Sequence, residues 1–283
     1  MPGDPVTLLL GENATPELVD LWRQRFGLDQ PLIWRYFTWL GNALSGDFGY
    51  SFHTEETVLQ LVADRLPVTL EILLITQLLA LVLAVPMAVY SAWQKNTWVD
   101  KVFMGGSLAF LSMPPFLVGI LLIYFFSIGL GWFPATGFTS VNEGLWANLR
   151  SILLPAGALA LAEFPIYMRL LRADLIQTLQ QDFITVARAK GLSTRRILWR
   201  HALKPSSFSL LTVIGINIGR LIGGTIIIEV LFALPGIGQL LIQSIFNQDF
   251  QVLQGVVLLV AVGFVVVNVA IDALYNWLDP RTK

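Results

Sequence analysis

Few side chains in this 283-residue sequence could carry out catalysis or bind a metal. The sequence has no cysteine, which excludes thiolate nucleophiles, disulfides and cysteine-based metal sites. Its two histidines, His53 and His201, fit no His-Glu-x-x-His or paired-ligand spacing. No Gly-x4-Gly-Lys-Ser/Thr phosphate loop and no Gly-x-Ser-x-Gly motif occurs. An intramembrane hydrolase would need serine and histidine together within apolar segments, and both histidines lie outside them.

Charged side chains within long apolar segments are the better candidates for function. Burying such a charge in lipid is costly unless it is paired or hydrated, so these residues mark transport pathways by default. Arg220 lies deepest, and two interpretations are open: a structural ion pair with Glu163, or a side chain lining a translocation path. The candidates are Glu71, Glu163, Arg220 and Glu229.

Composition indicates that these residues belong to an all-α polytopic membrane protein. Hydrophobic residues make up 55% of the chain and charged residues 13%, and the mean hydropathy is +0.68. A soluble domain carries about 25% charged residues. Uncharged runs of spanning length, roughly 20 residues, predict five spans, the second kinked at Pro114-Pro115. The spans are expected at 72–94, 102 to about 126, 152–171, 208–231 and 250–271.

Residues 1–67 are predicted to form an extracytoplasmic helical segment ahead of a transmembrane domain over 68–283. The segment holds nine acidic and four basic residues and no apolar run of spanning length. Thr15-Pro16 is a typical helix start, with Gly27 as its stop. Further helices are expected at 31–40 and from Thr54 into Pro67, with a loop at 41–49.

The loop charges predict the orientation. Residues 169–204 hold eight basic and two acidic residues, whereas 231–251 hold no basic residue. The positive-inside rule therefore places the loop at 174–205 and the C-terminus in the cytoplasm. Since the acidic segment then lies outside with no preceding apolar helix, we expect the native polypeptide to extend upstream of Met1.

The basic stretch at 182–205 is predicted to form two short helices that dock on another protein. Gly191 can take the positive φ that ends the first helix, and Ser193 can cap the second. Lipid headgroups would need the basic charge but not the small residues Ala187, Ala189 and Gly191, so docking is favoured over anchoring.

Three glycines, Gly215, Gly219 and Gly223, recur at every fourth position of the span at 208–231. Such a face allows another helix to approach closely, within this chain or across a dimer. A gating hinge is the alternative.

The order of residues from Ala187 to Ser193, followed by Arg200-His201-Ala202-Leu203, resembles the EAA loop of ABC importer permeases of the dipeptide, oligopeptide and nickel group. When the general EAA pattern is aligned on Gly191, its first position falls on Thr185. This sequence departs from the general pattern at Thr185, Val186 and Lys204, and it fits the peptide-importer variant closely. The resemblance implies an ATPase-coupling site made of Thr185, Val186, Ala187, Arg188, Ala189, Lys190, Gly191, Leu192 and Ser193.

Other stretches resemble the first (B-type) permease subunit of that group. They are Pro2-Gly3-Asp4-Pro5, Gly46-Asp47-Phe48-Gly49, the run from Glu229 to Leu240, and Leu278-Asp279-Pro280-Arg281. The resemblance implies a type I importer transmembrane fold with six spans, the first preceding Met1. It also implies an extracytoplasmic gate loop formed by Phe232, Pro235, Gly236 and Gly238.

Such a subunit would form half of the pore of an ATP-driven importer for peptides in a bacterial or archaeal cytoplasmic (inner) membrane. The resemblance implies a homologous second permease, two ABC ATPase subunits and an extracytoplasmic substrate-binding protein as partners, besides membrane lipids. ATP and magnesium are expected in the ATPases, with no cofactor, metal or nucleic acid bound by this chain.

Two other classes stay open from the residues alone. A secondary transporter could couple an ion gradient to Arg220 and Glu163, although the repeat symmetry of such folds is missing. A membrane-anchored scaffold without transport is the third interpretation.

Overall fold

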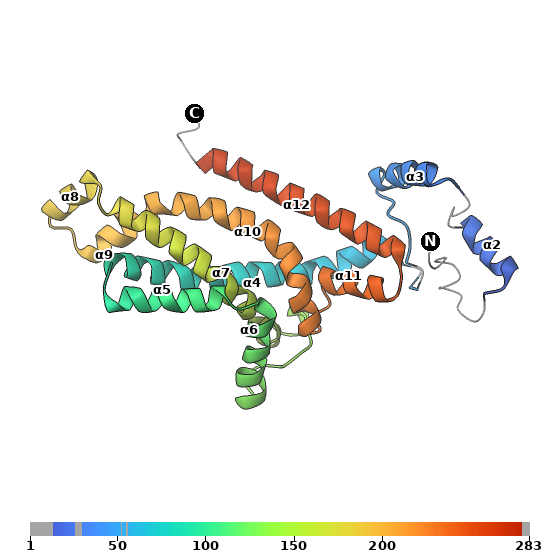
Figure 1. Cartoon of the computed structure of the whole chain (residues 1–283), viewed down its shortest axis with the longest axis horizontal. Helices are drawn as coiled ribbons and strands as arrows, with labels where there is room; N and C mark the ends of the chain where they lie inside the picture. Colours follow the sequence, from blue (N-terminus) through green and yellow to red (C-terminus); the bar gives the residue numbers. More distant parts are fainter. Residues whose placement is uncertain (1–13, 26–29, 52, 55, 279–283) are drawn as a thin grey trace. The chain divides into compact units, whose positions relative to one another are not determined.

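The computed structural model describes residues 14–25, 30–51, 53–54 and 56–278, and its regular structure is mainly helical (Figure 1). The chain divides into two compact units. One comprises Met1–Arg65 with Leu240–Leu259, and the other comprises Leu66–Gln239 with Val260–Lys283.

The first unit contains α2 (Pro16–Arg25) and α3 (Leu32–Leu44). The predicted start of α2 is confirmed, since the Leu18 amide donates to Thr15 Oγ1 at 3.4 Å. Its predicted stop, Gly27, lies outside the described residues, as do Pro2-Gly3-Asp4-Pro5 and Asp279-Pro280-Arg281. The loop predicted to begin at Gly41 is wrong, because α3 continues to Leu44 and buries Ala43. A single glycine costs a helix only about 1 kcal/mol, which that burial offsets.

The same unit also holds α11 (Ile237–Phe246) from Leu240 onward and the start of α12 (Phe250–Leu278). Hydrogen bonds join the chain before Val58 to the α11–α12 turn: Ser51 Oγ donates to Asp249 Oδ2 at 2.6 Å, and the Tyr50 amide donates to Gln251 Oε1 at 3.0 Å. The His53 Nε2 atom lies 2.8 Å from the Asn247 carbonyl oxygen. His53 therefore contributes to structure within this unit.

Helix α4 (Val58–Trp93) continues through Pro67 and Pro86 without interruption. The separate helix predicted from Thr54 to Pro67 is therefore wrong. Proline normally disrupts a helix interior because it removes one hydrogen bond and crowds the preceding turn. Here Val68, Thr69 and Ile72 are all buried just beyond Pro67, and this packing keeps the helix intact.

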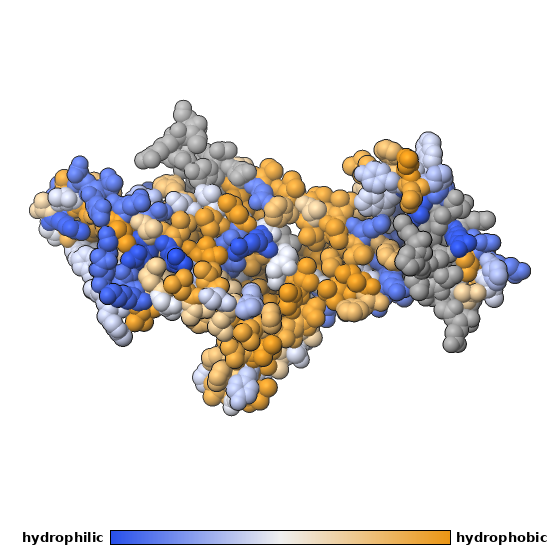
Figure 2. All heavy atoms as spheres, viewed as in Figure 1, coloured by the Kyte–Doolittle hydropathy of each residue, from blue (hydrophilic) through white to orange (hydrophobic). Residues whose placement is uncertain are grey.

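The second unit is built around α7 (Leu145–Thr178), which contacts α5 (Trp98–Leu111), α6 (Pro115–Leu122) and α10 (Leu203–Leu231). Ala80, Ala84 and Ala88 of α4 are fully buried at four-residue spacing and share a core with Tyr167 and Leu171 of α7. Small residues on one face let two helices approach closely. Figure 2 shows hydrophobic residues over α6, and hydrophilic residues gathered where α8 and α9 lie.

Among the described residues, three helices are long and apolar enough to cross a membrane, namely α4, α7 and residues 250–271 of α12. The number is five if each of two bent helix pairs counts as one span, which agrees with the prediction. One pair is α5 with residues 115–129, bent by 102°, so the expected kink at Pro114-Pro115 is a sharp turn. The other pair divides α10 near residue 222, with a bend of 55°.

Candidate functional site

The basic loop forms a helix, a glycine turn and a second helical segment. Helix α8 (Asp182–Ala189) precedes Gly191, whose φ of +74° confirms the predicted left-handed turn. Ser193 occupies the N-cap position of α9 (Thr194–Arg196), but its side chain makes no capping hydrogen bond. The prediction of a second short helix is wrong, because α9 leads through η4 (Ile197–Ala202) into α10 without a break.

The two faces of α8 differ in burial. Ile184 and Ala187 are buried in the core shared with α4 and α7, whereas Phe183 and Val186 are 47% and 52% exposed. Of the other predicted coupling residues, Leu192 is half-buried, and the exposed ones are Thr185, Arg188, Ala189, Lys190, Gly191 and Ser193. One face of the loop is thus tied to the helix bundle, and the opposite face presents apolar and basic side chains.

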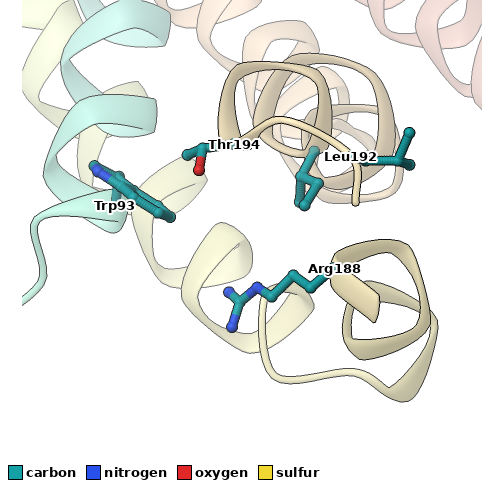
Figure 3. Close-up of a pocket in the computed structure, with 5 residues that line it drawn as sticks. Trp93, Arg188, Leu192 and Thr194 are labelled. Atoms are coloured by element: carbon teal, nitrogen blue, oxygen red, sulfur yellow. The ribbon is translucent and has the colours of Figure 1, made fainter. Parts of the chain in front are cut away.

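A cavity of about 350 Å³ lies beside this loop (Figure 3). It is lined by Trp93 at the end of α4, Arg188 of α8, and Leu192, Thr194 and Ile197. Two of these lining residues, Arg188 and Leu192, belong to the segment predicted to meet the ATPase.

Glu163 and Arg220 form the predicted ion pair. Arg220 Nη2 donates to Glu163 Oε1 at 3.1 Å, and Asn217 Nδ2 donates to Glu163 Oε2 at 2.9 Å. The Glu163 side chain is only 7% exposed, while that of Arg220 is 61% exposed. Nearby on α7, the Tyr167 hydroxyl donates to Gln77 Oε1 at 2.9 Å. These side chains form a polar cluster from α4, α7 and α10 inside an otherwise apolar bundle.

Glu229 lies apart from that cluster and fixes the predicted gate loop. The residue is fully buried. Its carboxylate accepts from Thr69 Oγ1 at 2.9 Å and from the Gln239 amide at 3.1 Å. Glu71, another of the charged candidates, is half-buried on α4.

The gate loop follows α10 directly. Phe232 is 1% exposed, and Ile237 donates its amide to Thr69 Oγ1 at 2.9 Å. A Cβ atom at Gly236 would collide with the Glu229 carboxylate, and one at Gly238 would lie 2.6 Å from the Ile226 Cα atom. The two glycines are therefore required for the turn after Pro235 to close on Glu229.

Of the three glycines on α10, two pack against α12. A Cβ atom at Gly215 would collide with Ile271, and one at Gly219 would lie 2.6 Å from the Phe264 ring. A Cβ atom at Gly223 would meet nothing within 4 Å. The packing prediction is confirmed within this chain for Gly215 and Gly219, whereas for Gly223 the alternative of packing across a dimer stays a prediction.

A buried ion pair between α5 and α7 was missed from the sequence. Arg172 Nη2 lies 2.6 Å from Asp100 Oδ2, and Arg172 Nε donates to Asp100 Oδ1 at 2.8 Å and to Ser91 Oγ at 3.0 Å. Asp100 lies between the predicted spans at 72–94 and 102 to about 126. An acidic residue in a region of basic excess was the one available signal, and the partner lies 72 residues away.

Two family models together match all of the chain except residues 74–83. Residues 84–283 match the family described as binding-protein-dependent transport system inner membrane component. Residues 1–73 match the family described as the N-terminal part of binding-protein-dependent transport system membrane components.

Several curated proteins are similar over the full length of this chain. A putative peptide transport system permease protein of Brucella abortus is 39% identical over 283 residues, which are 100% of this chain and 90% of that protein. An oligopeptide transport system permease protein of Bacillus subtilis is 35% identical, and a glutathione transport system permease protein of Escherichia coli K12 is 33% identical, with the same coverage.

Two solved structures share the fold. An inward-facing MetNI methionine ABC transporter matches with a TM-score of 0.65 at 16% identity, over 78% of this chain and 97% of that one. An amino acid ABC transporter with histidines matches with a TM-score of 0.53 at 17% identity, over 79% of this chain and 94% of that one. The all-α polytopic fold predicted from the sequence is confirmed.

Proposed function

The chain belongs to the family of binding-protein-dependent transport system inner membrane components, and we propose that it forms half of the translocation pore of an ABC importer for peptides. It is a transport permease subunit and a multi-pass inner membrane protein. The observation that carries the peptide assignment is full-length similarity to proteins named peptide, oligopeptide and glutathione permeases. The secondary-transporter alternative is rejected, since the family is binding-protein-dependent and the solved neighbours are ABC transporters.

The proposed assembly pairs this chain with a homologous second permease, two cytoplasmic ABC ATPase subunits and an external substrate-binding protein. ATP and magnesium would be bound by the ATPases. The basic charge of residues 169–204 supports a cytoplasmic location for α8 and the C-terminus. The scaffold interpretation would leave the similarity to permeases unexplained.

Coupling would pass through α8 as a lever. Its exposed face, with Phe183 and Val186, would contact an ATPase, while Ile184 and Ala187 hold its other face in the core beside α4 and α7. Because packed interiors transmit displacement rather than absorb it, ATPase closure that moves α8 would move these helices too.

ATP-dependent uptake tests the transport proposal. The complete transporter, purified from its native membranes and reconstituted with its binding protein, should accumulate labelled alanine peptides of two to five residues in proteoliposomes only when ATP is present. Uptake driven by a proton gradient without ATP, or no peptide uptake at all, would contradict it.

Val186→Glu should uncouple the ATPase without unfolding the permease. The Val186 side chain is half exposed in this chain, so the added charge is solvated until a partner covers it. A charge buried without a partner at an interface costs several kcal/mol, so we expect roughly a hundredfold loss of ATPase association and loss of substrate-stimulated ATP hydrolysis. Co-purification and hydrolysis assays measure both effects.

Gln180→Glu is the matched control, because it adds the same charge at an exposed position just ahead of α8. It should keep the ATPases bound. Equal behaviour of the two variants would show that the exposed face of α8 is not the docking surface.

A further inference from the structure

An exposed stripe runs along α10 and carries a single charge. Ile216 and Ile227 are each 60% exposed and Val230 is 44% exposed, and with Arg220 and Gly223 they recur every three or four residues. Because α10 bends by 55° between Leu221 and Gly223, this spacing places Ile216 and Arg220 on one face of the first segment, and Gly223, Ile227 and Val230 on one face of the second. A charged side chain on a face turned to lipid is strongly disfavoured. The face of the first segment that carries Arg220 is therefore better suited to a polar pathway than to the lipid.

Arg220 is held in place by a carboxylate that leaves most of it accessible. Glu163 accepts one hydrogen bond from it at 3.1 Å and is itself fixed by Asn217 at 2.9 Å. A guanidinium has five N–H donors in a rigid fork. The Arg220 side chain stays 61% exposed, so donors remain for a second acceptor on the exposed side.

Two glycines follow Arg220 closely in the sequence. Gly223 and Gly224 follow three and four residues after Arg220, at the start of the segment beyond the bend. A Cβ atom at Gly223 would meet nothing within 4 Å, and one at Gly224 would meet only Leu221, at 3.9 Å. The backbone at these two glycines is therefore open to a small group.

We propose that Arg220 is a transit site for a carboxylate of the cargo, which in a peptide is first of all its C-terminal carboxylate. This inference rests on the proposed function of peptide import. Guanidinium and carboxylate pair through two parallel hydrogen bonds, which gives selectivity for this group. Glu163 positions Arg220 and offsets part of its charge, so the cargo is held weakly enough to move on, as conduction requires.

The test combines a change in the protein with a change in the cargo. Initial uptake is measured in the reconstituted complete transporter, with saturating binding protein, for the alanine peptide transported fastest and for its C-terminal amide. The ratio of acid to amide uptake is compared between wild type and Arg220→Gln. Any preference of the binding protein for the acid or the amide affects wild type and variant equally. It therefore cancels when the two ratios are compared, as in a double-mutant cycle.

We expect the acid-to-amide ratio to fall about tenfold in Arg220→Gln, mainly through slower uptake of the free acid, and to be partly kept in Arg220→Lys. Arg169→Gln, which removes an exposed charge six residues beyond Glu163 on α7, should keep the wild-type ratio. An unchanged ratio in Arg220→Gln would overturn the inference. Peptide uptake that fails in wild type would instead contradict the proposed function.

Glu163→Gln provides a second variant should Arg220→Gln fail to assemble. It leaves Arg220 in place with less opposing charge, so the ratio should rise by a few fold; an unchanged ratio would again overturn the inference.

An amidated peptide ending in glutamate identifies the source of the carboxylate. If this peptide is taken up as fast as the free acid, the site accepts a side-chain carboxylate. If it is taken up only as fast as the amide, the site binds the C-terminal carboxylate.

Discussion

Arg172→Ala should lower the melting temperature of the detergent-solubilised protein by roughly 10 °C, equivalent to about 3–5 kcal/mol. The Arg172 and Asp100 side chains are 17% and 5% exposed, and two hydrogen bonds of 2.6 and 2.8 Å join them. Truncating Arg172 leaves the Asp100 carboxylate buried without its counter-charge. Fluorescence-monitored thermal unfolding measures the effect.

Arg169→Ala is the matched control, because this residue lies on the same helix and is exposed. Its melting temperature should stay within about 2 °C of wild type, as is usual for surface substitutions. The double variant Asp100→Ala/Arg172→Ala should be more stable than Arg172→Ala alone, because no buried charge remains. Identical melting of Arg172→Ala and Arg169→Ala would show that the ion pair does not hold α5 to α7.

Gly238→Ala should destabilise the gate loop by about 3 kcal/mol or more, since overpacking adds to the disturbance of a buried carboxylate. The new Cβ atom would lie 2.6 Å from the Ile226 Cα atom and 2.9 Å from Glu229 Oε2, and the first of these is backbone that cannot swing away. We expect a lower melting temperature and little mature protein in the membrane.

Gly105→Ala makes the same change on α5, where a Cβ atom meets nothing within 4 Å. Alanine favours a helix by up to about 1 kcal/mol over glycine, so this variant should be as stable as wild type or slightly more so. The prediction for the gate loop would be wrong if the two alanine variants melted alike.

Sequence patterns predicted the features that depend on local chemistry. Uncharged length identified the spans, and Gly191 identified the turn after α8, because a positive φ is strained for most other residues. The pairing of Arg220 with Glu163 was foreseen as one of two interpretations, because so few charges are available within the spans.

Features that depend on tertiary packing were not predictable in this way. Pro67 reads as a helix end, and only burial of the residues after it explains why α4 continues. Gly223 looks like Gly215 and Gly219 in the sequence, yet α12 packs on only two of the three. The partner of Asp100 depends on how α5 meets α7, which no short pattern contains.

The continuity of α4 determines what happens when the chain is shortened from its N-terminal end. At about 1.5 Å per residue, its 36 residues extend about 54 Å, well beyond a hydrocarbon core of about 30 Å. A protein shortened to begin at Val68 would place Thr69 in a new first turn, where helices fray and amides lack partners. Thr69 anchors both Glu229 and the Ile237 amide. Removing the polar N-terminal segment would therefore expose a new end of α4 at Thr69, and fraying of this end would loosen the gate loop.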